Sequence, residues 1–442
     1  MTDTPMSGER EVRRGLSRAD TMETVRKGLR ARYAAERRFI WYGRISIAIA
    51  LGFLILLVGS ILYRGTSAIT QTKILLPVEL PLEKLSIDGE VTAESLQKAD
   101  FGGFIKASLR NQFPDVKKRR DRRALYQLVS SGATYELRDR VIADPSLAGQ
   151  TVDVWLTASD DIDMLDKGYI DRDIDSTGRR VSDQQIAWYD KLIADGRLER
   201  TFNTTFFTSG DSREPEQAGI LGAALGSFYT LLVTLVLAFP LGVTTAVYLE
   251  EFAPKNKWTD LIEVNINNLA AVPSIIFGLL GLAVFLNVVG LPRSAPLAGG
   301  VVRALMTLPT IIIAGRAALK AVPPSIREAA LGVGASRLQT VTHHVLPLAM
   351  PGMLTGSIIG MAQALGETAP LLMIGMVAFI VDLPGGPLDP ATVLPVQVYI
   401  WADSPERAFV ERTSAGIIVL LLFLVVMNLS AVMLRKRFER RW

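Results

Sequence analysis

Long apolar runs are the feature that most constrains what this chain can fold into. Ile220–Leu249 contains no charged residue, and a helix of roughly 20 apolar residues is long enough to cross the hydrocarbon core of a bilayer. Inside lipid, every main-chain N–H and C=O must be bonded within the protein, so such a run folds as a helix. We therefore expect a membrane protein built from helices.

Six runs have the required length: Ile45–Leu62, Ile220–Leu249, Leu269–Leu291, Ser294–Gly315, Leu348–Val381 and Ser414–Leu434. The fourth contains Arg303 and the fifth contains Glu367, so their assignment rests on the apolar residues around them. Charged residues make up 21% of the chain, which is more than a pure membrane bundle carries. The expected fold is an all-α bundle of six transmembrane helices with one inserted domain.

These runs divide the chain into five parts: a basic arm (1–39), a first transmembrane helix (40–63), an insert (64–219), a five-helix core (220–434) and a basic tail (435–442). Ile40-Trp41-Tyr42 anchors the first helix at the membrane interface. We interpret that helix as a signal anchor, because its basic arm is long and no small-residue cleavage site follows it.

The insert has the patterns of a small α/β domain. Residues 151–157 and 201–208 alternate as strands do, and 121–141 and 182–197 have helical spacing. Its expected core lies around Trp155, Trp188, Phe206 and Phe207. The basic run 117–123 is interpreted as a solvated or partner-facing surface and not as a nucleic-acid site. Asp171, Asp173 and Asp175 begin like a calcium loop but depart from that pattern afterwards, so no metal site is expected.

Basic residues set the orientation, because short cytoplasmic flanks are rich in Lys and Arg. They cluster in the arm, in the tail and in the loop after the fourth run; among them are Arg10, Arg13, Arg14, Arg18, Arg316, Lys320, Arg327, Arg337 and Arg435. The segment Asp382–Arg412 is mainly acidic instead. With six spans, both termini and the loop are expected in the cytoplasm, and the insert outside it.

The cytoplasmic loop, Val322–Pro347, is predicted to be a hairpin of two short helices. Pro323 and Pro324 end the preceding helix, and Ser325 with Glu328 fits a capping box that starts a new one. Gly332 and Gly334 break that helix, and Ser336 with Gln339 repeats the box. Such a hairpin is typical of a surface that another protein grips, although an amphipathic loop without a partner is the alternative.

The same hairpin resembles the EAA loop of the membrane subunits of bacterial ABC importers, which docks in a cleft of the cytoplasmic ATPase subunit. Glu328, Ala329, Ala330, Gly332 and the closing Leu346-Pro347 carry the resemblance. Small residues let a helix lie close in a partner's groove. The resemblance implies that coupling to the ATPase is made by Ser325, Arg327, Glu328, Ala329, Ala330, Gly332, Gly334, Leu346 and Pro347.

Polar groups within the fourth and fifth runs are predicted to meet. Gly352, Gly356, Gly360 and Ala364 form a small-residue stripe that lets another helix approach, and helical periodicity places Glu367 on nearly the same face. Helix rise places Glu367 about 22 Å from the inner end and Arg303 about 13 Å from the outer end. These depths overlap, so an Arg303–Glu367 pair is expected, either as part of a transport pathway or as a tie between helices.

Two segments resemble the PstA-type permease of the phosphate importer: Ala364–Leu372, which contains Gly-Glu-Thr-Ala-Pro, and Asn268–Leu279, which contains Val-Pro-Ser-Ile-Ile-Phe-Gly. The resemblance covers roughly Gly219 to the C-terminus. Many relatives have Arg where this chain has Gln363, so a cation for the anion pathway must come from elsewhere. The implied pathway residues are Pro273, Ser274, Arg303, Gln363, Glu367 and Thr368.

A Walker-type phosphate loop is absent from the sequence, so the chain is predicted to be non-catalytic and to bind no cofactor itself. ATP and Mg²⁺ would lie on a partner ATPase. The resemblance implies these partners in the bacterial inner membrane: a second permease subunit of the PstC type, two ATPase subunits of the PstB type, a periplasmic phosphate-binding protein of the PstS type, and membrane lipid.

Three alternatives stay open. The chain could carry another oxyanion, such as sulfate or molybdate. It could be a membrane sensor, although the sequence shows neither a histidine-bearing catalytic domain nor a long helical linker. It could also be a channel, which would have no use for a docking hairpin.

Overall fold

The computed structural model describes residues 18–85, 92–175 and 178–438. The chain divides into two compact units, Met1–Ser60 and Ile61–Trp442. Arg10, Arg13 and Arg14 of the basic arm, and the end of the basic tail from residue 439, lie outside the described residues. Each unit is described by itself below.

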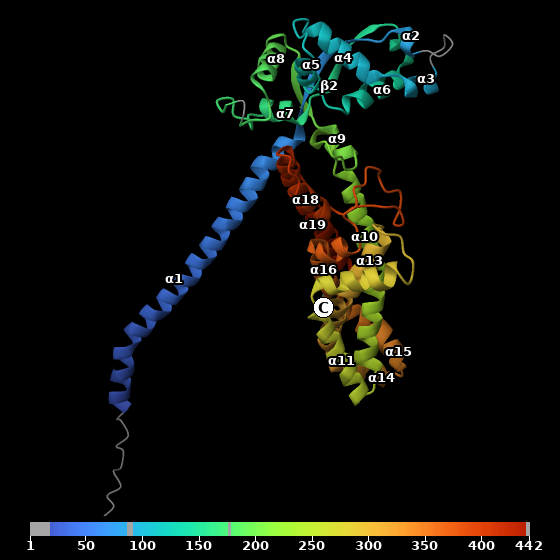
Figure 1. Cartoon of the computed structure of the whole chain (residues 1–442). Helices are drawn as coiled ribbons and strands as arrows, with labels where there is room; N and C mark the ends of the chain where they lie inside the picture. Colours follow the sequence, from blue (N-terminus) through green and yellow to red (C-terminus); the bar gives the residue numbers. More distant parts are fainter. Residues whose placement is uncertain (1–17, 86–91, 176–177, 439–442) are drawn as a thin grey trace, which may run out of the picture. The chain divides into compact units, whose positions relative to one another are not determined.

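The described part of the first unit is helix α1 (Arg18–Gly65), which continues a few residues past the boundary of the unit (Figure 1). The predicted span Ile45–Leu62 lies within this longer helix. Apolar side chains such as Phe53 and Leu56 are 70% exposed, and the helix is long and apolar enough to cross a membrane. Exposed apolar area of this size is stable against lipid or protein but not against water.

The second unit begins with a three-stranded antiparallel sheet. Its strands are β1 (Thr70–Glu79), β2 (Thr151–Thr157) and β3 (Leu198–Phe202), and β1 lies between the other two. Lys73 pairs with Thr157 on one side and with Glu199 on the other. Alternate residues of β1 enter the core, as a period of two requires.

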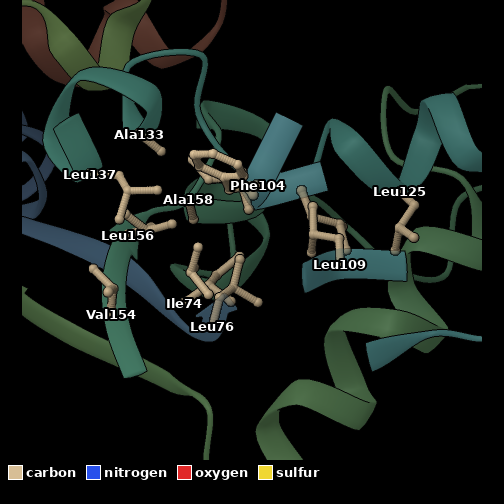
Figure 2. Packing of buried hydrophobic residues seen from close by; sticks show 14 of the residues in the cluster. Ile74, Leu76, Phe104, Leu109, Leu125, Ala133, Leu137, Val154, Leu156 and Ala158 are labelled. Carbon is tan, nitrogen blue, oxygen red and sulfur yellow. The ribbon is translucent and has the colours of Figure 1, made fainter. Parts of the chain in front are cut away.

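Seven helices of the described chain contribute to the core around this sheet: α2 (Leu82–Leu85), α3 (Ala93–Lys98), α4 (Phe101–Gln112), α5 (Arg119–Tyr126), α6 (Ala133–Ala143), α7 (Asp160–Asp166) and α8 (Asp183–Ala194). Helix α9 (Thr204–Thr208) follows β3 and contacts α10, and the short 3-10 turns are η1 (Thr66–Ile69), η2 (Pro145–Leu147) and η3 (Pro215–Gln217). Figure 2 shows Ile74 and Leu76 of β1 among Phe104, Leu109 and Leu137 of the helices. This cluster is the core of the α/β portion.

Several predictions for this portion are wrong in detail. Trp155 is only half-buried, because Val154 and Leu156 on either side of it supply the core contacts of β2. The strand predicted over 201–208 ends at Phe202, because the Asn203 side chain accepts from the Phe206 main-chain N–H and starts α9. Phe206 then packs near Trp401, 6.3 Å between ring centres, in a different cluster.

The helix predicted over 121–141 is also wrong, because it divides into α5 and α6 at the turn of residues 127–132. That turn brings Val129 into an isolated bridge with Ala158 at the end of β2. Trp188, in contrast, is 8% exposed and belongs to the core as predicted.

The remaining helices are α10 (Leu221–Val247), α11 (Lys257–Ala270), α12 (Ser274–Leu280), α13 (Pro296–Lys320), α14 (Pro324–Gly332), α15 (Arg337–Gln339), α16 (Leu346–Gly366), α17 (Ala369–Met373), α18 (Leu394–Ala402) and α19 (Ala408–Phe438), with π-turns η4 (Tyr248–Phe252), η5 (Gly281–Leu286) and η6 (Thr340–Val345). Among the described residues, five helices can cross a membrane, or six elements when one bent pair counts as a span.

That bent pair corrects the predicted third span, Leu269–Leu291. Lys257–Ala270 and Ser274–Leu286 meet at an angle of 103°. Pro273 lies at the break with an extended backbone (φ −56°, ψ 135°) and immediately precedes α12. Because proline lacks the N–H that a continuing helix would use, the two halves separate there.

The small-residue stripe of α16 packs on α13, as predicted. Gly352 lies against Ala318, and Gly356 lies against Ala314 so closely that no side chain fits between them. Gly360 faces Thr307 and Thr310 one turn further along. These contacts hold the two helices at close backbone distance, the packing that small residues permit in membranes.

A buried ion network joins the α/β portion to α19. Lys167, beside the end of α7, lies 2.7 Å from Asp163 Oδ2 and 2.7 Å from Glu411 Oε1, and these side chains are 3%, 7% and 5% exposed. Ser67 donates to the other Glu411 oxygen at 2.9 Å, and the Thr72 main-chain N–H donates to Asp163 at 2.8 Å. Both carboxylates are thus paired and hydrogen-bonded.

Candidate coupling hairpin and buried arginine site

The first helix of the hairpin, α14, begins at Pro324 with Pro323 as the N-cap residue. The predicted capping box of Ser325 and Glu328 is therefore wrong, since no side chain caps this helix. Proline at the first helical position has a suitable φ and lacks an N–H that would otherwise need a partner. Ser325 consequently lies inside the first turn, and its side chain is exposed.

The second helix begins as predicted. The Ser336 hydroxyl accepts from the Gln339 main-chain N–H at 3.2 Å, and the Gln339 side chain accepts from the Ser336 main-chain N–H at 2.9 Å. Gly334 has a φ of +90°, a conformation that favours glycine. The turn at Gly334 and the capping box together separate α15 from α14.

Arg327 fixes the hairpin to the membrane helices. Its Nη2 lies 2.6 Å from Glu251 Oε1 in η4, and its guanidinium also donates to the carbonyls of Leu319 and Val322 at 2.9 Å and 2.7 Å. Arg316 makes a parallel contact, 2.6 Å from Glu263. The sequence analysis did not single out Glu251, although its position just after an apolar run could have indicated an anchor for Arg327.

The hairpin presents an exposed face around these anchors. Leu331, Val333 and Leu338 are 51%, 86% and 61% exposed, and Glu328 and Ala329 are exposed beside them. Ala330, in contrast, is buried against the rest of the hairpin. Uncovered apolar residues in a folded hairpin are typical of surfaces that contact a protein or a membrane.

A groove of about 490 Å³ lies where the two ends of the hairpin meet the membrane helices, between Val322 and Ile326 on one side and Pro347 and Pro351 on the other. Leu346 and Pro347 are half-buried at its edge. The residues predicted to couple thus fall into three sets: Ser325, Glu328, Ala329, Gly332 and Gly334 are exposed, Leu346 and Pro347 are half-buried at the groove, and Arg327 and Ala330 hold the hairpin in shape.

The second candidate site lies where α16 ends. The predicted fifth span ran on to Val381, but α16 stops at Gly366 and Glu367 is extended (φ −81°, ψ 116°). Pro370 lacks the N–H that a continuing helix would bond to the Gly366 carbonyl, so the chain breaks and restarts as α17. Glu367 is therefore at a break in the helix and not on its face.

Arg303 of α13 reaches this break and is fully buried, with 0% of its surface exposed. Its Nη2 donates to the Glu367 main-chain carbonyl at 3.1 Å, whereas Nε and Nη1 make no hydrogen bond to any described residue. The Glu367 carboxylate accepts from the Ser274 hydroxyl of α12 at 2.9 Å. Arg303 and Glu367 are thus neighbours, but the bond runs through the main chain.

Close packing of α12 on α17 assembles these groups. Gly278 approaches Pro370 so closely that an added Cβ would lie 2.7 Å from its Cα. Of the other predicted pathway residues, Pro273 and Gln363 are exposed and Thr368 is half-buried. The site therefore combines a buried cation with free N–H donors, a carboxylate and a hydroxyl, drawn from three segments.

Comparison of the sequence with known proteins identifies the family of this chain. The model of the binding-protein-dependent transport system inner membrane component matches residues 238–442, and a domain of unknown function (DUF3333) matches residues 26–176. The phosphate transport system permease protein PstA 1 of Mycobacterium tuberculosis is 32% identical over 229 residues, which are 51% of this chain and 74% of that protein. The chain belongs to the family of PstA-type ABC transporter permeases.

A probable ABC transporter permease protein, YqgI of Bacillus subtilis, is 33% identical to this permease over 187 residues, 42% of this chain and 63% of that protein. Among solved structures, the inward-facing MetNI methionine ABC transporter matches with a TM-score of 0.41 and 20% identity, covering 49% of this chain and 95% of the other. The family match and the apolar helices together make the permease a multi-pass protein of the inner membrane.

Proposed function

We propose that this permease is a membrane-spanning subunit of an ATP-driven importer for inorganic phosphate. The observation that supports it most directly is Arg303, a fully buried guanidinium with two nitrogens that form no hydrogen bond within the described part of the chain. A guanidinium binds phosphate oxygens in a two-pronged geometry. The related permeases that are described as phosphate transporters point to the same substrate.

The neighbouring carboxylate favours phosphate over the other oxyanions. Phosphate keeps at least one proton near neutral pH, because its third ionisation requires strongly basic solution, and can donate that proton to Glu367. Sulfate and molybdate carry no proton there and would meet the carboxylate as a like charge. Glu367 already accepts from Ser274, so one of its oxygens is held in place. Gln363, Thr368, Pro273 and Ser274 are proposed to line the remaining path of the anion.

Uptake by the reconstituted complex tests the substrate. Vesicles containing this permease, its partner permease, the ATPase subunits and the loaded binding protein should accumulate phosphate when ATP is present. Sulfate and molybdate at tenfold excess should leave that uptake unchanged. Transport of sulfate at an equal rate would instead assign the protein to another oxyanion.

Coupling is proposed to run through the hairpin, residues 322–347. Its exposed Glu328, Leu331 and Val333 would dock on an ATPase subunit that binds ATP and Mg²⁺, while the Arg327–Glu251 contact passes the motion to α10 through η4. A change of state requires contacts that differ between the two states. A second permease subunit would complete the pathway, and a phosphate-binding protein would deliver the anion.

The chain lacks cysteine, so single introduced cysteines can test both this contact and the topology. Val333→Cys should cross-link to the ATPase subunit and resist a membrane-impermeant maleimide added from outside. Asn111→Cys, exposed on α4 of the insert, should react with that maleimide and give no ATPase cross-link. The opposite labelling pattern would place the hairpin outside and contradict cytoplasmic termini.

A further inference from the structure

A pocket of about 500 Å³ lies in the α/β portion, apart from the hairpin and the buried arginine. Ile105 and Leu109 of α4 and the bridge residue Val129 provide an apolar wall. Most of its charged lining is acidic: Asp160 and Asp161 at the start of α7, and Glu214 and Glu216 at η3, with Lys106 of α4 as the one basic side chain among the described residues of the lining. One side of the pocket is thus apolar and the other acidic.

Glu216 is the best-defined group in this pocket. It is 3% exposed, and its Oε1 accepts from the Ser130 hydroxyl at 2.5 Å, whereas Oε2 is buried and makes no hydrogen bond to any described residue. The Ser159 hydroxyl, which also lines the pocket, is buried without a partner too. A buried carboxylate oxygen without a partner is destabilising unless a ligand donates to it.

The backbone around Glu216 is firmly held. Its main-chain carbonyl accepts from the Gln71 side chain of β1 at 2.8 Å, and the neighbouring Gln217 donates to the hydroxyls of Ser130 and Ser131 at 3.2 Å and 3.0 Å. The unpartnered oxygen therefore belongs to a fixed position and not to a loose side chain.

Negative charge exceeds positive charge around the pocket. Burial raises the pKa of Glu216 to about 7, with Asp160 and Glu214 adding to the rise, and burial together with Asp160 raises the pKa of Asp161 to about 6. The charged groups that share the pocket lining with Glu216 are Lys106, Asp160, Asp161 and Glu214, and Glu136, Asp139, Asp211 and Asp382 lie with it around the adjoining pocket. Arg180 and Glu406 act on Asp161. Arg180 lies 3.9 Å from Asp160 Oδ2 and 3.8 Å from Asp161 Oδ1.

We propose that this pocket binds one organic cation, an alkylammonium or alkylguanidinium group. The charged head would donate to Glu216 Oε2, and the alkyl stem would lie along Ile105, Leu109 and Val129, as the stems of Lys and Arg do on apolar surfaces. Among the described residues no three acidic or histidine side chains are placed to ligate a metal ion. The source is a basic side chain of a partner protein or a free amine.

Glu216 is also linked to the membrane helices by its place in the chain. η3 ends at Gln217, and α10 begins at Leu221 only a few residues later. A cation bound to Glu216 Oε2 would therefore lie a few residues before the outer end of α10, the first helix of the five-helix core. Binding at this pocket is therefore positioned to change the position or orientation of α10.

Calorimetric titration of the full-length protein in lipid nanodiscs tests the proposal. N-butylguanidinium should bind, and uncharged N-butylurea should not. Glu216→Gln, which keeps the acceptor for Ser130, should weaken binding at least about tenfold, because it removes a charge-assisted hydrogen bond. Asp153→Asn, a control at an exposed carboxylate of β2, should bind like the wild type. Affinity should fall as the pH drops below about 7, since Glu216 must be ionised.

A capped arginine peptide distinguishes the two sources: tighter binding than N-butylguanidinium supports a protein partner, and weaker binding supports a free amine. Thermal unfolding of Glu216→Gln checks its fold. If that variant does not fold, the exposed Glu214→Gln replaces it, with an expected loss of about twofold to threefold. Equal binding by N-butylurea, or unchanged affinity in the variant tested, would overturn the proposal.

Discussion

Two buried cations in this permease, Lys167 and Arg303, differ in how many of their hydrogen-bond and ion-pair partners the fold supplies. Lys167, between α7 and α19, lies 2.7 Å from each of two carboxylates that are themselves almost fully buried. Arg303, between α13 and the break after α16, donates to one main-chain carbonyl, and its other two nitrogens have no partner among the residues that the structure describes. The first cation is fully neutralised by the fold, and the second is not.

This difference indicates different roles. A buried charge with all its partners present is self-contained, and its removal leaves the partners uncompensated. A buried charge with free donors is tolerated only where something else supplies the acceptors for part of the working cycle. We therefore interpret Lys167 as a tie between the α/β portion and α19, and Arg303 as a group held ready for an anion.

The largest expected effect comes from breaking the tie. Lys167→Met should destabilise the protein by about 3–5 kcal/mol, because Asp163 and Glu411 would be left buried without a cation. Thermal unfolding in detergent measures the loss, and uptake per folded molecule should stay within about twofold of the wild type. The triple variant Lys167→Met, Asp163→Asn, Glu411→Gln should recover most of the stability. If the triple variant did not recover stability, the network would stabilise the protein through its specific contacts and not only by neutralising charge.

Arg303→Gln should act in the opposite way. Phosphate uptake should fall at least about 100-fold through the loss of two charge-assisted hydrogen bonds to the anion, while the assembled complex keeps its thermal stability to within about 1 kcal/mol. Arg303→Lys should restore only part of the uptake, because a point charge does not reproduce the guanidinium fork. If Arg303→Gln showed wild-type uptake, Arg303 would have only a structural role, like that of Lys167.

Local interactions account for the parts of the hairpin that the sequence predicts well. The Ser336–Gln339 box joins residues within one turn, so its pattern is sufficient. The Ser325–Glu328 pattern is as good, yet Pro324 begins the helix one residue earlier and the box does not form. The anchor between Arg327 and Glu251 joins residues far apart in sequence, which no local pattern reveals.

At the arginine site, too, some features could be predicted from the sequence and others depended on contacts between distant residues. Depth in the membrane predicts that Arg303 and Glu367 are neighbours, because helix rise is regular. The nature of their contact was not predictable, since it depends on two breaks, at Pro273 and after Gly366, that interrupt apolar runs the sequence analysis read as continuous. Both breaks interrupt helical hydrogen bonding within apolar runs, which is tolerated in a membrane protein where other protein groups or a polar pathway satisfy the main chain.

Glu367→Gln sharpens the assignment of the anion. The main-chain carbonyl that Arg303 uses is unchanged in this variant, so the fold should be preserved. The variant should lose about tenfold in phosphate uptake, because an amide can still accept a hydrogen bond but carries no charge to attract the phosphate proton. Inhibition by sulfate should increase at the same time. Competition between the two anions in reconstituted vesicles measures this change. An unchanged preference for phosphate would mean that Glu367 does not discriminate between the two anions.

The smallest expected effect belongs to Ser274, which touches the carboxylate and not the cation. Ser274→Ala should lower uptake by about fivefold or less, equivalent to about 1 kcal/mol, the net value of one ordinary hydrogen bond. Ser357→Ala is the matched control, since that buried hydroxyl donates to the Met353 carbonyl within α16. If Ser274 acts by holding Glu367, the double variant Ser274→Ala, Glu367→Gln should be no worse than Glu367→Gln alone. Additive losses would instead mean that Ser274 contacts the anion independently, and the carboxylate would then be positioned by the break in the helix and not by its hydroxyl neighbour.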